Sequence, residues 1–123
     1  MDDLFLMIRA CVTLPDEATP RLALADLIQE RGEPARAARL RQDGVWVTTP
    51  RGYLAWEWGP GPLSRTVVWK RWPAEGSDAP ACSDCPARRG LLYTSCPYNR
   101  EINDQDVRLW LCVRCYNNRA ADI

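Results

Sequence analysis

Six cysteines are the residues of this chain best suited to chemistry, and four of them form two pairs. The pairs are Cys82-Ser-Asp-Cys85 and Cys112-Val-Arg-Cys115, called here the first and second hooks. Two cysteines separated by two residues can bind one metal ion, and two such hooks in succession are typical of a structural zinc site. The sequence therefore predicts one zinc ion bound by Cys82, Cys85, Cys112 and Cys115.

Zinc bound by four thiolates forms a closed site. Thiolate is a soft ligand that suits zinc, and a four-sulfur shell leaves no open position for water or substrate. A metal ion held in this way stabilises a fold and does not activate a nucleophile. Two alternatives use the same residues: an iron–sulfur centre and a redox-active dithiol. Because a dithiol normally needs one exposed pair rather than two matched pairs, structural zinc is the preferred interpretation.

The other two cysteines lie outside the hooks. Cys96 begins the segment Cys96-Pro97-Tyr98-Asn99, which resembles a hook without its second cysteine. It could replace one of the four ligands, but two complete hooks already satisfy tetrahedral zinc, so we expect a spare thiol. Cys11 shares helical spacing with apolar residues and is predicted to be a small core residue.

No other set of residues indicates catalysis. The chain contains no histidine, and the sequence has neither a phosphate-binding glycine loop nor a nucleophile motif. Asp26 and Glu30 lie four residues apart and could share a helical face, but ion pairing with nearby arginines is the simpler interpretation. We therefore expect a protein that is not an enzyme, with no catalytic residues and no small-molecule substrate.

The composition is that of a globular protein of 123 residues, 46% hydrophobic and 26% charged. It has 16 basic and 16 acidic residues, whereas a general polyanion-binding protein is usually more basic. The N-terminus starts with acidic residues and a short apolar stretch, unlike a secretory signal. No apolar run has the length of a membrane span. With the paired cysteines, these features predict a reduced, cytoplasmic protein that does not associate with a membrane.

The predicted fold class is α+β, beginning with a small N-terminal helical bundle. Apolar residues at helical spacing, together with capping residues, indicate three helices with short connections. The expected helices run from Asp2 to Thr13, from the N-cap Thr19 to the C-terminal cap Gly32, and from Glu33 to Gly44. Helices joined by short connections should pack into a compact bundle over residues 1–44.

The second of these helices carries a family resemblance. Residues 20–33 read Pro-Arg-Leu-Ala-Leu-Ala-Asp-Leu-Ile-Gln-Glu-Arg-Gly-Glu. They resemble the bacterial repeat-companion domain, whose usual pattern is Pro-Arg-Leu-x-x-Ala-Asp-Trp-Leu-x-Glu-Arg-Gly-Asp. The resemblance extends over residues 4–42, and Leu27 stands where the family usually has tryptophan. It implies a short helical accessory module of a bacterial, intracellular protein, and it implies no reaction.

Residues 45–72 contain five of the six tryptophans and predict an antiparallel, tryptophan-rich β-meander. Three β-prone runs, at 45–49, 53–58 and 66–72, are separated by turn-forming Pro and Gly residues. Most tryptophans in small domains are buried, so core packing is the first interpretation. The alternative is an exposed aromatic platform with neighbouring basic residues. That surface for a partner or nucleic acid would comprise Trp69, Lys70, Arg71, Trp72, Arg88 and Arg89.

Residues 73–81 read as a linker, and residues 82–123 as a zinc module. Two β-prone runs, at 91–94 and 107–111, lie between the hooks, and residues 116–123 can continue as a helix. A hook, a hairpin and a second hook at the start of a helix resemble the treble-clef zinc finger. This resemblance specifies metal binding but no particular function.

These features together predict a non-enzymatic bacterial zinc-binding interaction or adaptor module. Its expected cofactor is one structural zinc ion, and its expected partner is another protein. The alternatives are a nucleic-acid-binding zinc-finger protein and a small accessory subunit of a larger bacterial enzyme or defence complex.

Overall fold

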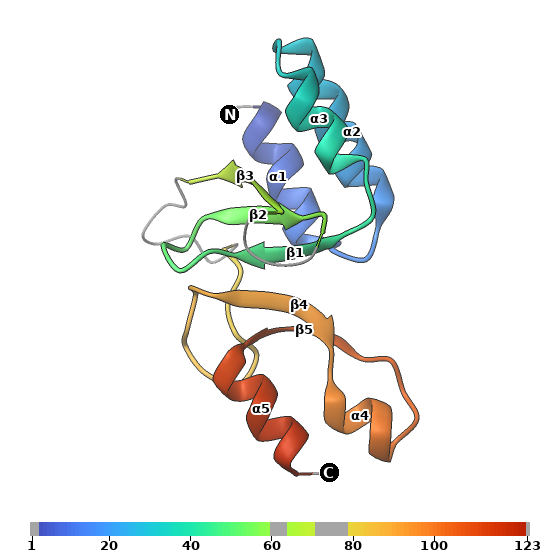
Figure 1. Cartoon of the computed structure of the whole chain (residues 1–123), viewed down its shortest axis with the longest axis vertical. Coiled ribbons are helices and arrows are strands. Elements are labelled where there is room, and N and C mark those ends of the chain that lie inside the picture. Colours follow the sequence, from blue (N-terminus) through green and yellow to red (C-terminus); the bar gives the residue numbers. More distant parts are fainter. Residues whose placement is uncertain (1–2, 60–63, 71–78, 123) are drawn as a thin grey trace.

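The computed structural model describes residues 3–59, 64–70 and 79–122 (Figure 1). These residues form five helices and one five-stranded antiparallel sheet, which confirms the predicted α+β class. The helices are α1 (Asp3–Thr13), α2 (Ala18–Glu30), α3 (Pro34–Leu40), α4 (Pro97–Ile102) and α5 (Val113–Ala121). The strands are β1 (Val45–Thr48), β2 (Leu54–Glu57), β3 (Arg65–Trp69), β4 (Leu91–Ser95) and β5 (Arg108–Cys112). Within the described residues, no helix is long and apolar enough to cross a membrane.

Helices α1, α2 and α3 form the predicted bundle, with small and aliphatic side chains turned inward. The buried residues are Ile8, Cys11, Leu24, Ala25, Ile28, Ala37 and Leu40. Cys11 is only 1% exposed, as expected of a core residue. Burial raises the pKa of its thiol to about 12, which keeps it neutral and suited to an apolar interior.

The predicted start of α2 at the N-cap Thr19 is wrong. The helix begins at Ala18, and Glu17, in extended conformation, precedes it as the N-cap residue. Pro20 is therefore the third helical residue, a position whose N–H would have no intrahelical partner in any case. The predicted C-terminal cap is confirmed, because Gly32 has φ +88° and the Glu33 N–H reaches back to the Ile28 carbonyl at 3.2 Å.

Helix α3 ends at Leu40 rather than continuing to Gly44. The Arg21 side chain donates hydrogen bonds to the carbonyls of Leu40 and Gln42, and Trp56 Nε1 donates to the Gln42 carbonyl at 3.1 Å. Side chains from α2 and β2 thus donate hydrogen bonds to the carbonyl groups at the C-terminal end of α3. Gly44 then passes so close to β2 that a Cβ there would lie 2.9 Å from the Trp56 ring.

The predicted meander is present as β1, β2 and β3. Trp46 and Trp56 are cross-strand partners with ring centroids 4.9 Å apart, and both are buried. Trp58, Trp69 and Trp110 are partly buried and pack against the same core. The tryptophans of the described chain therefore contribute mainly to the core. Trp72 and the linker residues 73–78 lie outside the described residues.

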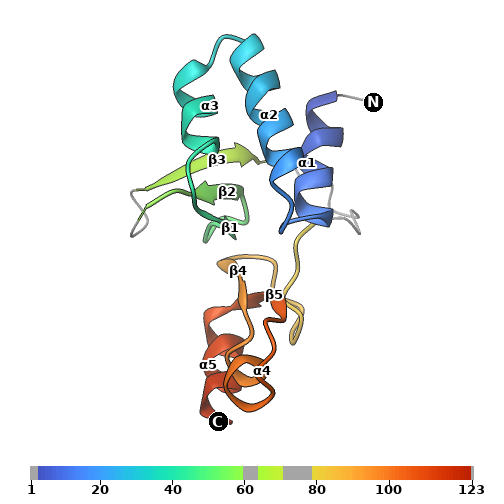
Figure 2. The same cartoon turned by 90° about the vertical axis from the view of Figure 1, so that its right-hand side faces the viewer.

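One sheet joins the meander to the C-terminal hairpin, with strand order β3-β2-β1-β4-β5. Strand β4 pairs with β1 through Val47 and Leu92. The Thr48 hydroxyl donates to the Arg88 carbonyl at 3.2 Å and accepts the Leu91 N–H at 2.9 Å. In two perpendicular views, α1 to α3 lie at one end of the long axis and α4 and α5 at the other (Figures 1 and 2). The sheet lies between them and links the two ends.

Candidate metal centre

The four hook cysteines come together from two segments of the chain. Cys82 and Cys85 lie in the turn that precedes β4. Cys112 is the last residue of β5 and the N-cap of α5, and Cys115 lies in the first turn of that helix. The second hook therefore lies at the start of a helix, as predicted. The antiparallel pairing of β4 with β5, from Leu91–Cys112 to Ser95–Arg108, returns the chain to the first hook.

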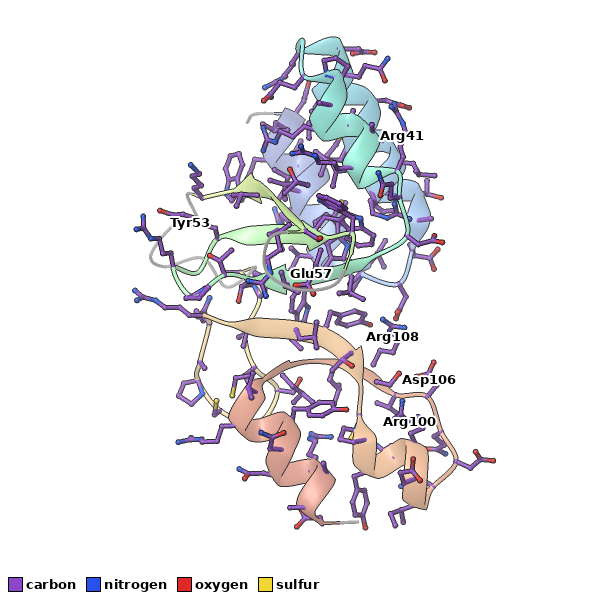
Figure 3. All side chains as sticks on the ribbon, viewed as in Figure 1. Arg41, Tyr53, Glu57, Arg100, Asp106 and Arg108 are labelled. Carbon is purple, nitrogen blue, oxygen red and sulfur yellow. The ribbon has the colours of Figure 1, made fainter. Side chains whose placement is uncertain are left out.

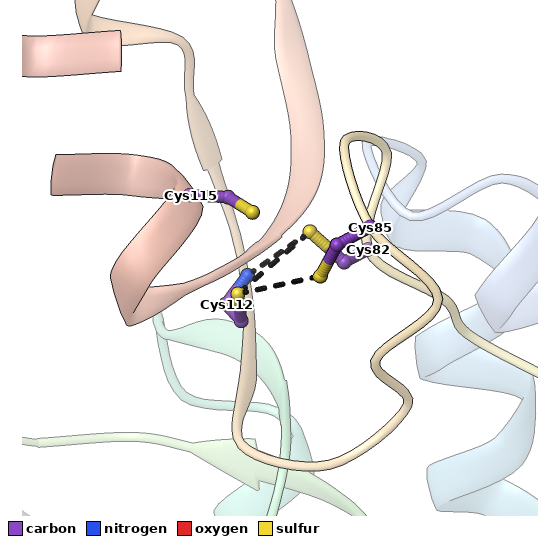
Figure 4. Close-up of side chains that lie close together, drawn as sticks. All are labelled: Cys82, Cys85, Cys112 and Cys115. Atoms are coloured by element: carbon purple, nitrogen blue, oxygen red, sulfur yellow. Dashed lines mark hydrogen bonds between the residues drawn. The ribbon is translucent and has the colours of Figure 1, made fainter. Parts of the chain in front are cut away.

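The four sulfur atoms lie within 4.8 Å of one another (Figure 4). Cys112 Sγ is 3.9 Å from Cys82 Sγ and 3.8 Å from Cys85 Sγ. A tetrahedral zinc ion with Zn–S bonds of about 2.3 Å requires S···S separations of about 3.8 Å. The four cysteines therefore form a cluster that can hold a metal ion with little movement of the side chains.

Backbone hydrogen bonds hold the first hook against β5. The Ser83 N–H donates to the Trp110 carbonyl at 2.9 Å, and the Cys82 N–H donates to the Ala87 carbonyl at 2.8 Å. The Cys112 N–H points at Cys82 Sγ at 3.5 Å. Such N–H groups orient the sulfur ligands of a metal and reduce their negative charge.

The pKa values of Cys82 and Cys115 move in opposite directions. Burial opposes ionisation of Cys82, but backbone N–H groups of Cys112, Asp84 and Cys85, with the Cys85 thiol, lower its pKa to about 7. Hydrogen bonding to Cys112 and burial raise the pKa of Cys115 to about 12. A bound divalent cation would favour the thiolate form of every ligand.

Cys96 lies outside the cluster, as predicted for a spare thiol, but it is not a loose loop residue. It is fully buried and is the N-cap residue of α4. The Arg119 guanidinium donates to its sulfur at 2.9 Å. Burial opposes ionisation of Cys96, but the Asn99 backbone N–H and Arg119 outweigh it and lower the pKa of this thiol.

Protein-family models, curated proteins and solved structures gave no match to the chain. The resemblance to the repeat-companion domain therefore rests on the sequence of residues 4–42, above all on the motif that begins at Pro20, and it stays a prediction. The treble-clef resemblance likewise rests on the order of hook, hairpin, hook and helix.

The predicted partner surface is only partly within the described residues, since Arg71 and Trp72 lie outside them. Trp69 packs against the helical core, with its ring centroid 5.4 Å from that of Phe5. The exposed Lys70 ammonium lies 5.6 Å from the centre of the Tyr53 ring. Of the described residues in the Trp69-to-Trp72 segment, Lys70 is therefore the one exposed to a partner.

Arg88 and Arg89 are exposed between the first hook and β4. The Gly90 N–H donates to the Thr49 carbonyl at 3.0 Å, which holds this segment beside the β1–β2 turn. A Cβ at Gly52 would lie 3.4 Å from Arg89 Cγ. Because Tyr53 follows Gly52, the Arg89 and Lys70 side chains both lie near the same end of the meander, marked by Tyr53 in Figure 3.

One of the two carboxylates considered for catalysis, Asp26, has a structural partner. Asp26 forms an ion pair with Arg41 at 2.7 Å, with 71% of the Asp26 side chain exposed. Both Asp26 and Glu30 line a wide, shallow hollow with Gln29 and Arg41. An exposed ion pair of this kind contributes little to stability.

A helix and a long-range contact are among the features that were not predicted from the sequence. Helix α4 was missed, although Pro97 at its first position was a visible start signal. A contact between the two ends of the molecule was also missed: Asp16 accepts a hydrogen bond from Tyr93 and pairs with Arg108 at 3.1 Å. No local pattern could have found this contact, because Asp16 and Tyr93 are 77 positions apart.

Proposed function

We propose that this protein is a bacterial zinc-binding interaction module with no catalytic activity, in which one structural zinc ion supports a treble-clef-like unit. The observation that carries the proposal is the cluster of four sulfurs within 4.8 Å of one another. Four cysteine sulfurs this close together suit a single metal ion. An iron–sulfur cluster, whose iron ions are bridged by sulfide, would need the two hooks farther apart. The closed thiolate shell also leaves the metal no position for substrate.

Metal analysis of the purified chain tests this proposal. We expect one zinc per chain, and Cys112→Ser should abolish stoichiometric binding. Cys96→Ser is the matched control, since Cys96 lies outside the cluster, and it should retain one zinc. With Co²⁺ as probe, both the parent chain and Cys96→Ser should give the charge-transfer spectrum of four thiolates. Iron or no metal in the parent chain, or loss of zinc from Cys96→Ser, would contradict the assignment.

An apolar hollow beside the second hook supports a protein partner. It has a volume of about 140 Å³ and is lined by Leu92, Thr94, Leu111, Val113 and Tyr116. Val113 is 70% exposed and Leu92 is 37% exposed, and both line this hollow, so they form an apolar patch of the kind that protein partners cover. We propose that a protein partner docks here in the bacterial cytoplasm, where free cysteines remain reduced.

Val113→Asp tests this docking site, with Ala121→Asp on the exposed end of the same helix as control. Proteins that co-purify with the parent chain from its host should be lost with Val113→Asp and kept with Ala121→Asp. Zinc content should be equal in all three proteins. Retention of the same partners by Val113→Asp would rule out this surface.

Nucleic-acid binding is the second candidate, and the placement of Lys70 and Arg89 at one end of the meander favours it. Lysine and arginine side chains contact phosphates, so binding should weaken as salt rises. The test is the affinity for a short DNA duplex at two salt concentrations. Lys70→Gln with Arg89→Gln should weaken binding and reduce the salt dependence. Arg100→Gln, on α4 away from this end, should do neither (Figure 3).

A further inference from the structure

Arg119 joins the two hooks directly, without using the metal. It lies on α5, four residues after the ligand Cys115 and therefore near the same face of the helix. Its Nε and Nη2 donate to Asp84 Oδ2 and Oδ1, each at 2.5 Å. Asp84 lies between the two cysteines of the first hook. A bidentate pair thus connects the helix that carries the second hook to the loop that carries the first.

The third nitrogen of the same guanidinium holds the segment between β4 and α4. Arg119 Nη1 donates to Cys96 Sγ at 2.9 Å. Arg119 and Asp84 have side chains 26% and 31% exposed, whereas Cys96 is fully buried. The planar guanidinium is suited to this arrangement, because its fixed fork can bind a carboxylate through two nitrogens and still offer the third.

We infer that Arg119 is a positioning residue for the metal, which holds the two hooks at coordinating distance in the folded site. This inference rests on the proposed zinc function. Forming the site brings two segments of the chain together, and the binding energy of the metal offsets the free-energy cost of doing so. A contact that joins the two hooks when the site forms reduces this cost, so it raises metal affinity without donating a ligand.

Zinc affinity of Arg119 variants, measured by competition with a chromophoric chelator, tests the inference. Residues that orient metal ligands typically change affinity by about 10- to 100-fold when mutated, so we expect Arg119→Gln to bind zinc about tenfold more weakly. Arg119→Lys keeps the charge and one contact to Asp84, and it should recover part of the loss. Arg100→Gln removes an exposed arginine from α4 and should stay within about twofold of the parent chain.

A double-mutant cycle separates positioning from a general loss of stability. Asp84→Asn should weaken zinc binding, and adding Arg119→Gln to it should weaken binding by less than Arg119→Gln does alone. Both changes break the Asp84–Arg119 pair, and only the bond from Arg119 to Cys96 is then left to lose. The Co²⁺ spectrum should stay that of four thiolates in every variant, since no ligand is lost. Should Arg119→Gln fail to fold with zinc, Asp84→Asn with Arg119→Lys carries the same test.

The outcomes distinguish this inference from the function on which it rests. A parent chain that binds no zinc would overturn both. A parent chain that binds one zinc, with Arg119→Gln binding as tightly, would overturn only the role of Arg119. The role of Arg119 would also be overturned if the losses of zinc affinity in Asp84→Asn and Arg119→Gln added fully in the double variant.

Discussion

The Tyr93 hydroxyl donates a hydrogen bond to Asp16 Oδ2 at 2.6 Å, across 77 positions of sequence. Asp16 lies between α1 and α2, and Tyr93 lies in the middle of β4. Arg108 on β5 completes the contact, since it pairs with Asp16 at 3.1 Å and lies 5.3 Å from the centre of the Tyr93 ring. The strand that leads to Cys112 is thereby attached to the helical bundle, with Arg108 placed between the two ends in Figure 3.

Tyr93→Phe should lower the free energy of unfolding. The Tyr93 residue is 7% exposed, and its hydroxyl bonds a charged carboxylate, an interaction worth about 1–2 kcal/mol. Urea unfolding of the zinc-loaded chain would measure the loss. Tyr98→Phe is the control, because Tyr98 is 37% exposed on α4 and should change stability little. Equal stabilities of the Tyr93 and Tyr98 variants would show that the hydroxyl bond contributes nothing.

The same tyrosine should make stability depend on alkaline pH. Burial, reinforced by Asp16, raises the pKa of Tyr93 from 10.0 to about 12. A folded-state pKa above the unfolded one means that this contribution is fully present below about pH 10 and is lost as pH rises toward 12. The stability difference between the parent chain and Tyr93→Phe should therefore shrink over that range. A difference independent of pH between 9 and 12 would contradict the assignment.

Gly44 and Gly32 should respond differently to alanine. At Gly44 a Cβ would lie 2.3 Å from the Glu57 carbonyl oxygen, so Gly44→Ala forces backbone to move and should cost about 2–3 kcal/mol. At Gly32 no atom lies within 4 Å of a Cβ, but its φ of +88° disfavours alanine by about 1 kcal/mol. Thermal unfolding of the two variants would rank them. A smaller loss of stability in Gly44→Ala than in Gly32→Ala would mean that β2 can shift to accommodate the added methyl group.

The metal cluster was predictable because its signal is local. Each hook is a four-residue pattern, and thiolate chemistry restricts what two such hooks can do. The three helices and the meander followed from apolar spacing and turn residues in the same way. The start of α2 was predicted two residues late. Thr19 resembles an N-cap, but the turn that ends at Glu17 already directs the chain into the helix.

The contacts that join these parts were not predictable from one sequence. The Val47–Leu92 pairing, the Asp16–Tyr93 bond and the Arg119–Asp84 pair each connect residues far apart in the chain. Many arginines and aspartates were available for such pairs, and local patterns do not choose among them. Cys96 illustrates the same limit, because its spare thiol became a buried partner of Arg119 only through the fold.

Removal of the metal should unfold the two ends of the molecule unequally. The helices and meander have their own core, whose fully buried members include Leu24, Leu40 and Trp46. The second core, around Leu91 and Leu111, contains hook cysteines and should not persist when the metal is removed. After chelation, hydrogen exchange should accelerate sharply in β5 and α5, while α2 and β1 keep most of their protection. Readdition of zinc should restore slow exchange in the parent chain but not in Cys112→Ser. Uniform loss of protection throughout the chain would show instead that the sheet makes both ends unfold as one unit.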